Sequence, residues 1–69
     1  MPVFLNGESQ NLSEPISLSD LVVQLELAPS RIAIELNRTV VRRTDWPATA
    51  IKEGDKIEIV HFVGGGDRV

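Results

Sequence analysis

The chain has 69 residues, with seven basic and ten acidic side chains, a net charge of −3 and no cysteine. This length allows one domain with a small core. The lack of cysteine excludes disulfides, thiolate metal sites and a side-chain persulfide. A single histidine argues against a metal centre. The acidic balance argues against nucleic acid as a partner, and with neither a signal peptide nor an apolar run near the roughly 20 residues of a membrane span we expect a cytoplasmic protein without membrane contact.

Residues 2–12 predict a β-hairpin. A short apolar strand, Val3 to Leu5, is closed by Asn6-Gly7. This pair favours a type I′ turn, because both central positions of that turn need positive φ. The strand expected over residues 8–12 is polar, which is typical of a sheet edge with one solvated face.

A helix is predicted from Ser17 onward. Ser17 can cap it, and Asp20 lies in the first turn, where a carboxylate is favourable. Pro29 is expected to end the helix near Leu27. The i, i+3, i+4, i+7 spacing of one buried face is followed by Leu18, Leu21, Val22 and Leu25.

The middle of the chain predicts a second strand pair. Apolar residues alternate over residues 31–37, a turn follows at Asn37-Arg38, and residues 39–42 form a short return strand. Residues 45–47 look like a loop, whose Trp46 is expected to plug the core. The basic residues Arg38, Arg42 and Arg43 form either a solvated surface or a docking patch for an acidic partner.

A turn is predicted at residues 53–55 and the last strand at residues 56–63. The two faces of this strand differ. Ile57 and Ile59 are assigned to the core, and His61 to a structural or surface role. Val60 and Phe62 then lie exposed on the opposite face, together with Val63 at the start of the tail. Exposed apolar residues of this kind often mark a partner-binding site.

The predicted element order is hairpin, helix, strand, short strand and strand. One helix over one mixed sheet of four to five strands is an α+β fold, and this order is that of the ubiquitin-like β-grasp, with first and last strands adjacent at the sheet centre. We assign residues 1–63 to this domain and residues 64–69 to a C-terminal glycine tail with a three-residue extension.

The tail passes from the last strand into Gly64, Gly65 and Gly66. Three residues without Cβ atoms order at a large entropic cost and cannot pack as a core. They are either a flexible end or a thin thread that enters a narrow site on another protein, and we favour the thread. No histidine, carboxylate and nucleophile set accompanies them, so we do not expect an enzyme.

The chain resembles the small sulfur-carrier proteins of thiamin biosynthesis, the ThiS family. The resemblance spans essentially residues 1–66 and is carried by five ordered motifs, which are Phe4-Leu5-Asn6-Gly7, the helix start at residues 17–22, the strand at residues 33–37, the turn and strand at residues 54–60, and the closing Val63-Gly64-Gly65-Gly66.

The resemblance implies a mechanism with Gly66 as the carrier residue. An activating enzyme of the ubiquitin-activating type uses ATP and Mg²⁺ to adenylate the terminal carboxylate, and sulfur from a donor protein then displaces AMP to leave a thiocarboxylate. A thiazole synthase receives that sulfur. The chain itself binds no cofactor in this scheme and acts as a co-substrate.

The sequence departs from the family at its end, because Asp67-Arg68-Val69 follow the glycine on which other members finish. A processing peptidase that removes these residues, an inactive precursor, or a tripeptide foreign to the natural protein would each account for them. Alternatives to the thiamin carrier are a carrier for another pathway, similar to the molybdopterin-synthase small subunit, and a ubiquitin-like modifier or binding module.

Overall fold

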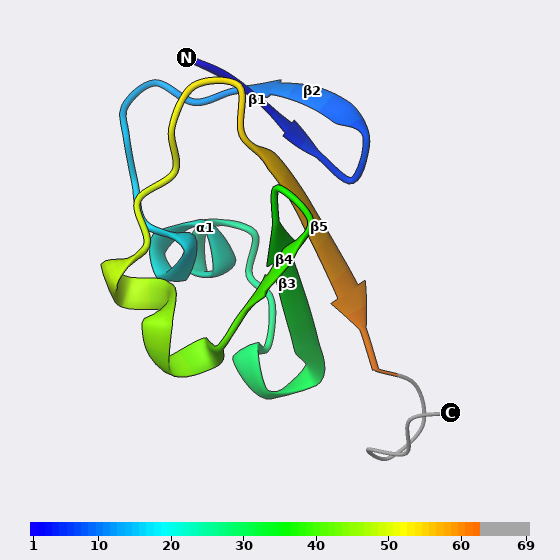
Figure 1. Ribbon diagram of the computed structural model, residues 1–69. Coiled ribbons are helices and arrows are strands. Elements are labelled where there is room, and N and C mark those ends of the chain that lie inside the picture. The colour runs from blue at the N-terminus through cyan, green and yellow to red at the C-terminus, as the bar shows by residue number, and fades with distance from the viewer. Residues whose placement is uncertain (63–69) are drawn as a thin grey trace.

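Strand β5 (Lys56–His61) lies at the centre of the sheet in the computed structural model, which describes residues 1–62 (Figure 1). Within these residues the sheet has five strands in the order β2-β1-β5-β3-β4. Its other strands are β1 (Pro2–Leu5), β2 (Glu8–Asn11), β3 (Ile32–Leu36) and β4 (Thr39–Val41). The predicted end of the domain at Val63 and the predicted tail at residues 64–69 lie outside the described residues.

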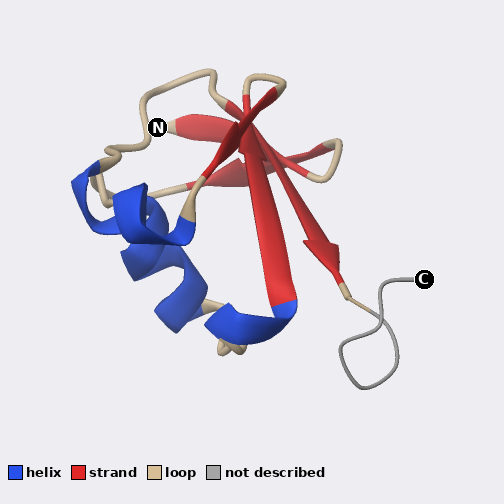
Figure 2. Cartoon of the chain, turned by 60° about the horizontal axis from the view of Figure 1, so that its bottom comes forward, coloured by secondary structure: helices blue, strands red, loops and turns tan. Residues whose placement is uncertain are grey.

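Strands β1 and β5 are parallel neighbours, while the other adjacent strands pair antiparallel. Helix α1 (Leu18–Gln24) and two 3₁₀ segments, η1 (Pro29–Arg31) and η2 (Arg43–Ala48), complete the described chain. Figure 2 shows these helical segments on one side of the strands. The predicted mixed sheet with one α-helix, an α+β fold of the β-grasp type, is confirmed.

Both hairpins turn through two residues with positive φ. The angles are 50° and 84° at Asn6 and Gly7, and 52° and 74° at Asn37 and Arg38. These values match the left-handed positions of type I′ turns, so both turn predictions are confirmed. Asparagine suits such positions because its short polar side chain can satisfy backbone groups nearby.

The two turn asparagines also bind the central strand. Asn6 Oδ1 accepts a hydrogen bond from the Ile59 amide at 2.7 Å, and Asn6 Nδ2 donates to the Ile59 carbonyl at 3.4 Å. Asn37 Oδ1 accepts from the Lys56 amide at 2.9 Å, while its Nδ2 donates to an Asp55 carboxylate oxygen at 3.0 Å. The asparagine side chain in each turn therefore bonds backbone groups of β5 and adds to its pairing with the neighbouring strands.

Helix α1 begins as predicted and ends earlier than predicted. Ser17 Oγ accepts from the Asp20 amide at 3.0 Å, and the Asp20 carboxylate accepts from the Ser17 amide at 3.2 Å, which completes a capping box. The helix stops at Gln24, because Glu26 adopts φ of 58° and the amides of Glu26 and Leu27 bond back to the last helical turn.

This early end overturns two predictions. Pro29 does not terminate the helix and instead opens η1. Leu25 is the C-cap residue and is 39% exposed, so it does not belong to the buried helix face. The Leu25 backbone is still right-handed helical and its amide bonds the Leu21 carbonyl at 2.9 Å, but its side chain does not pack against the core.

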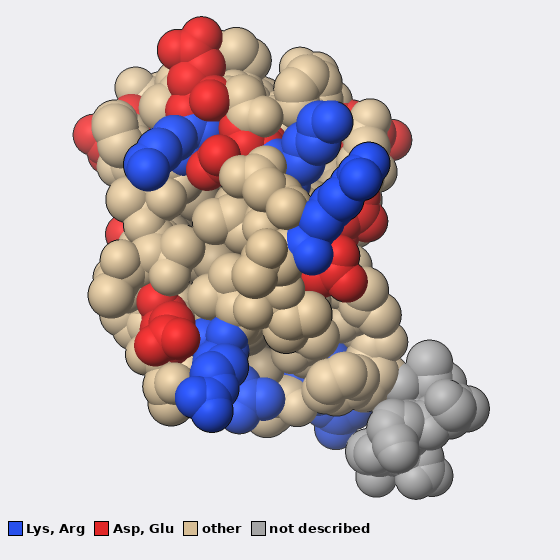
Figure 3. All heavy atoms as spheres, viewed as in Figure 1, with Lys and Arg blue, Asp and Glu red and all other residues tan. Residues whose placement is uncertain are grey.

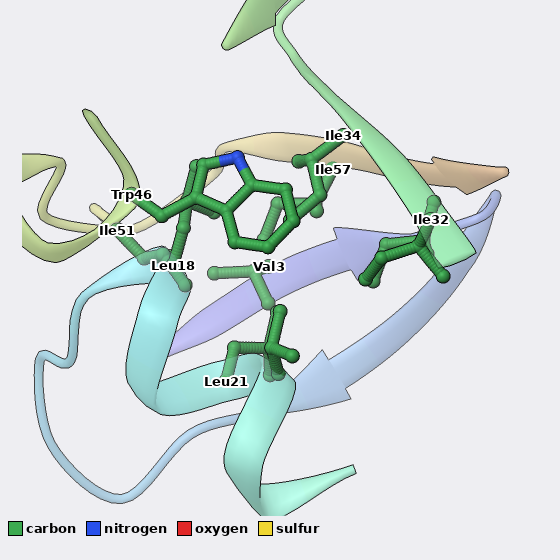
Figure 4. Packing of buried hydrophobic residues seen from close by; sticks show 10 residues of the cluster. Val3, Leu18, Leu21, Ile32, Ile34, Trp46, Ile51 and Ile57 are labelled. Atoms are coloured by element: carbon green, nitrogen blue, oxygen red, sulfur yellow. The ribbon is translucent and has the colours of Figure 1, made fainter. Parts of the chain in front are cut away.

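The core lies between the sheet and the helical segments (Figure 4). Trp46 is 3% exposed there and donates its indole N–H to the Val41 carbonyl at 2.9 Å, so its predicted core role is confirmed. The predicted loop around it is wrong, since η2 covers these residues. The buried apolar set is Val3, Leu18, Leu21, Val22, Ile32, Ile34, Trp46, Ile51, Ile57 and Ile59.

We predict that Asn6→Gly lowers the free energy of unfolding by about 1–2 kcal/mol, because the Ile59 amide and carbonyl lose their partner. Glycine tolerates φ of 50°, so the substitution leaves the turn itself unstrained. Urea denaturation measures the change. Gln10→Ala, on the exposed edge strand β2, is the control and should change stability by less than about 0.5 kcal/mol. Equal effects of the two substitutions would contradict the role given to Asn6.

Candidate functional site

The chain is held in the sheet up to the last described residue. His61 pairs with Ile32 of β3, and the Phe62 amide donates to the Arg31 carbonyl at 2.9 Å. The predicted site residues that follow, Val63, Gly64, Gly65 and Gly66, lie outside the described residues. What the structure defines is the base from which they continue.

Strand β5 extends beyond its neighbour β1. The paired residues of β1 and β5 are Phe4 with Lys56 and Leu5 with Ile57, and the Asn6 side chain reaches as far as Ile59. From Val60 onward, β5 has β3 as its only strand neighbour within residues 1–62. Its end therefore projects at one corner of the sheet (Figure 1).

The two faces of β5 divide as the sequence predicts. Ile57 and Ile59 are 0% and 8% exposed and pack in the core, whereas Val60 and Phe62 are 54% and 42% exposed. His61 is exposed as well. A short apolar strip thus lies on the outer face of β5, at the base of the glycine tail.

The outer face of the sheet carries more exposed apolar residues than the sequence predicts. Val60 lies opposite Ala33 of β3, and one step further along the strands Glu58 lies opposite Glu35, which in turn lies opposite Val40 of β4. Val40 is 64% exposed. Alternation along β4 could have placed it on this outer face, because the residue beside it, Val41, contacts the core.

Phe4 of β1 also lies among the exposed apolar residues of the sheet, at 40% exposure. Phe4 was predicted as part of the first apolar strand and of the Phe4-Leu5-Asn6-Gly7 motif, without a role at the site. Its neighbour Val3 is 2% exposed, so the alternation of the first strand identifies Phe4 as outward-facing. The outer face thus carries exposed apolar groups beside Glu35 and Glu58. Exposed apolar groups of this kind often mark a protein-binding surface.

The predicted group of arginines is divided by the fold. Arg38 occupies the β3–β4 turn, beside the start of β5, where Leu36 pairs with Ile57. Arg42 and Arg43 follow β4 and lie toward the other end of the sheet. Arg31 joins them there, since its carbonyl binds Phe62 and the Arg43 Nε donates to the Pro29 carbonyl at 3.1 Å.

The described residues carry an exposed apolar surface. Among residues 1–62 no charged or polar side chain is buried, and no three metal-ligating side chains gather. No helix in this part of the chain combines the length and apolarity needed to cross a membrane. The features that stand out are the apolar strip and the anchored base of the tail.

These features define a class of protein, a small β-grasp domain that presents an apolar sheet face next to a C-terminal glycine run. The ThiS family model matches residues 3–66, and the chain belongs to the ThiS family. A solved structure of the thiamine biosynthesis protein ThiS from Geobacter metallireducens superimposes with a TM-score of 0.84, at 32% identity, and the match covers 96% of this chain and 100% of that one.

Relatives of two sizes share the domain. The sulfur carrier protein ThiS of Bacillus subtilis is 32% identical over 63 residues, which cover 90% of this chain and 96% of that protein. The thiazole synthase of Magnetococcus marinus is 42% identical over 66 residues, covering 96% of this chain and 20% of that protein. The chain therefore spans about a fifth of the length of this second relative.

Proposed function

We propose that this chain is a sulfur carrier for thiamin biosynthesis, with Gly66 as the residue that holds the sulfur. The observation that carries the proposal is the match to the ThiS family over residues 3–66, which ends on the glycine run. The relative from Bacillus subtilis is named a sulfur carrier protein. The chain supplies the carrier group and other proteins supply the catalysis.

The chemistry requires an activated carboxyl group. A carboxylate is a poor electrophile, so the activating enzyme transfers AMP from ATP to the Gly66 carboxylate and releases pyrophosphate. The terminal sulfur of a persulfide on the donor protein then attacks the acyl carbon and AMP leaves, which gives an acyl disulfide between the two proteins. A thiol of the donor attacks its own sulfur in that disulfide, so the S–S bond to the carrier breaks, the thiocarboxylate leaves, and the donor keeps a disulfide. ATP and Mg²⁺ belong to the activating enzyme, and because ATP is consumed we expect the reaction in the cytoplasm.

In this reaction the domain positions the reacting C-terminus. Hydrogen bonds hold the chain up to Phe62, so the glycine run begins from a fixed point. Four extended residues, 63–66, span roughly 13 Å at about 3.3 Å per residue, which lets the terminus reach an active site below a protein surface. Gly64 and Gly65 have no side chains to obstruct a narrow channel, while Val60, Phe62 and Val63 contact the surface around it.

A thiazole synthase is the expected acceptor of the sulfur. Two thiazole synthases, from Magnetococcus marinus and Paramagnetospirillum magneticum, match 96% of this chain with a fifth of their own length. A carrier-like region within a synthase chain raises the local concentration of one reactant near the other. This arrangement in the relatives supports direct transfer from this domain to a synthase.

The Gly66 carboxyl is bound to Asp67 in the sequence, and an amide cannot be adenylated as a free acid can. The proposal therefore includes removal of residues 67–69 by a peptidase before activation. The ten buried apolar residues found among residues 1–62 are all kept in a chain that ends at Gly66.

We predict that the chain ending at Gly66, incubated with its activating enzyme, ATP and a sulfur donor, exchanges one oxygen for sulfur at its terminus. Intact-mass measurement detects the exchange, and fragmentation assigns it to Gly66. The full-length chain is the matched control and should stay unmodified until a peptidase removes residues 67–69. An unmodified Gly66 terminus would overturn the proposal, and attachment to lysines of other proteins would support a modifier instead.

We also predict that Phe62→Asp weakens binding to the activating enzyme by about tenfold or more, because a charge replaces an apolar contact at the base of the tail. Titration calorimetry measures the dissociation constant. The melting temperature should change little, since Phe62 is 42% exposed.

Val23→Asp is the matched control for this substitution. Val23 is 72% exposed on α1, on the other side of the sheet from the strip. It should leave the dissociation constant within about twofold, because surface positions outside an interface contribute little to binding. Equal weakening by both substitutions would show that the outer face of β5 has no special part in binding.

A further inference from the structure

Three arginines gather around the end of the sheet from which the tail continues. The Arg31 carbonyl binds the Phe62 amide, and Arg42 directly follows β4, whose Val41 pairs with Ile34. Arg43 is tied to the same region by its bond to the Pro29 carbonyl. Figure 3 shows basic side chains along the lower edge of the molecule, toward which β5 runs in Figure 1, with an acidic group directly beside them.

Of these three arginine side chains, that of Arg43 is held by contacts within residues 1–62. The Arg43 guanidinium lies over the Trp46 ring at 6.0 Å from its centroid and binds the Pro29 carbonyl at 3.1 Å. Arg31 and Arg42 are exposed, and neither side chain hydrogen-bonds another residue of 1–62. Asp45 is the acidic residue of η2, close in sequence to Arg42 and Arg43.

A basic end is notable in a chain whose net charge is −3. Under the proposed function, the tail must bring one more negative group, its carboxylate, toward an enzyme that holds the phosphates of ATP. A carrier approaching with a negative surface would be repelled over a Debye length of about 8 Å at physiological salt. The arginines place positive charge on the part of the carrier surface that reaches the enzyme first.

We propose that Arg31 and Arg42 form an electrostatic docking surface for an acidic rim around the tail-binding channel of the activating enzyme. This inference rests on the proposed function. The tail reaches only roughly 13 Å beyond the domain when extended, so residues at its base come close to the channel mouth when the terminus reaches the active site. Alternation from the exposed Val40 places Arg42 on the outer side of the sheet, the side that carries the apolar strip.

Exposed charges of this kind act mainly on the rate of association. Complementary charges around an apolar contact guide the two proteins into register and raise the association rate, and salt reduces the effect. The apolar strip then holds the complex. The two kinds of contact are therefore separable by experiment.

The test compares charge reversals at opposite ends of the sheet in the chain ending at Gly66. The double variant Arg31→Glu, Arg42→Glu is compared with Arg38→Glu, an exposed arginine in the β3–β4 turn beside the start of β5. Stopped-flow mixing with the activating enzyme measures the association rate constant over a range of salt concentrations. We expect the double variant to associate about tenfold more slowly at low salt, with a flatter salt dependence, and Arg38→Glu to differ less than twofold.

Arg31→Gln with Arg42→Gln, which removes charge without reversing it, should give an intermediate rate. Unchanged association by the double reversal, or equal slowing by Arg38→Glu, would overturn the inference. The same mixing experiment is run with the thiazole synthase. If the double variant associated more slowly with the synthase but not with the activating enzyme, the inference would also be overturned, because the acidic rim would then belong to another protein. If wild-type carrier still gains its thiocarboxylate in any of these cases, the proposed function stands and the docking surface alone fails.

Discussion

The structure depends on the way β5 is held from both sides. β1 lies parallel to it on one edge and β3 antiparallel on the other, and two asparagines from the hairpin turns complete its backbone bonding. Buried Ile57 and Ile59 fasten the same strand to the core. The strand therefore presents its end at a fixed corner of the sheet, which is the property a carrier with a terminal reactive group requires.

This arrangement divides the chain into two parts with different roles. The strands and α1 enclose an apolar core with no buried charge among the described residues, and this part provides stability and a surface. The proposed chemistry falls on a single carboxyl group at Gly66. Under the proposed function, this domain takes part in an ATP-dependent reaction without catalytic side chains of its own, because the activating enzyme and the thiazole synthase supply them at its terminus.

Much of the fold follows from local patterns in the sequence. The Asn6-Gly7 pair, the Ser17 and Asp20 capping box and the alternation in β3 and β5 each require a particular backbone, and the structure contains all of them. The apolar strip at Val60 and Phe62 was predictable for the same reason. Its extension to Phe4 and Val40 needed the sheet order, although the alternation of those strands already indicated it.

Other features depend on contacts that the sequence pattern does not express. Glu26 ends α1 in a left-handed conformation that glycine usually occupies, and Leu25 is exposed although its amide still bonds the Leu21 carbonyl. Arg31 is eleven residues from Arg42 in sequence, and only the pairing of β3 with β4 and β5 brings them to one end of the sheet.

The central claim is that sulfur travels on the carboxyl end of this domain and leaves it for a thiazole. The most direct measurement is a single-turnover reaction of carrier loaded with isotopically labelled sulfur at Gly66, mixed with the thiazole synthase and its other substrates. Mass spectrometry follows both products. The account predicts labelled sulfur in the thiazole and a carrier returned as the plain carboxylate, whereas an unlabelled thiazole, or label retained on the carrier, would contradict it.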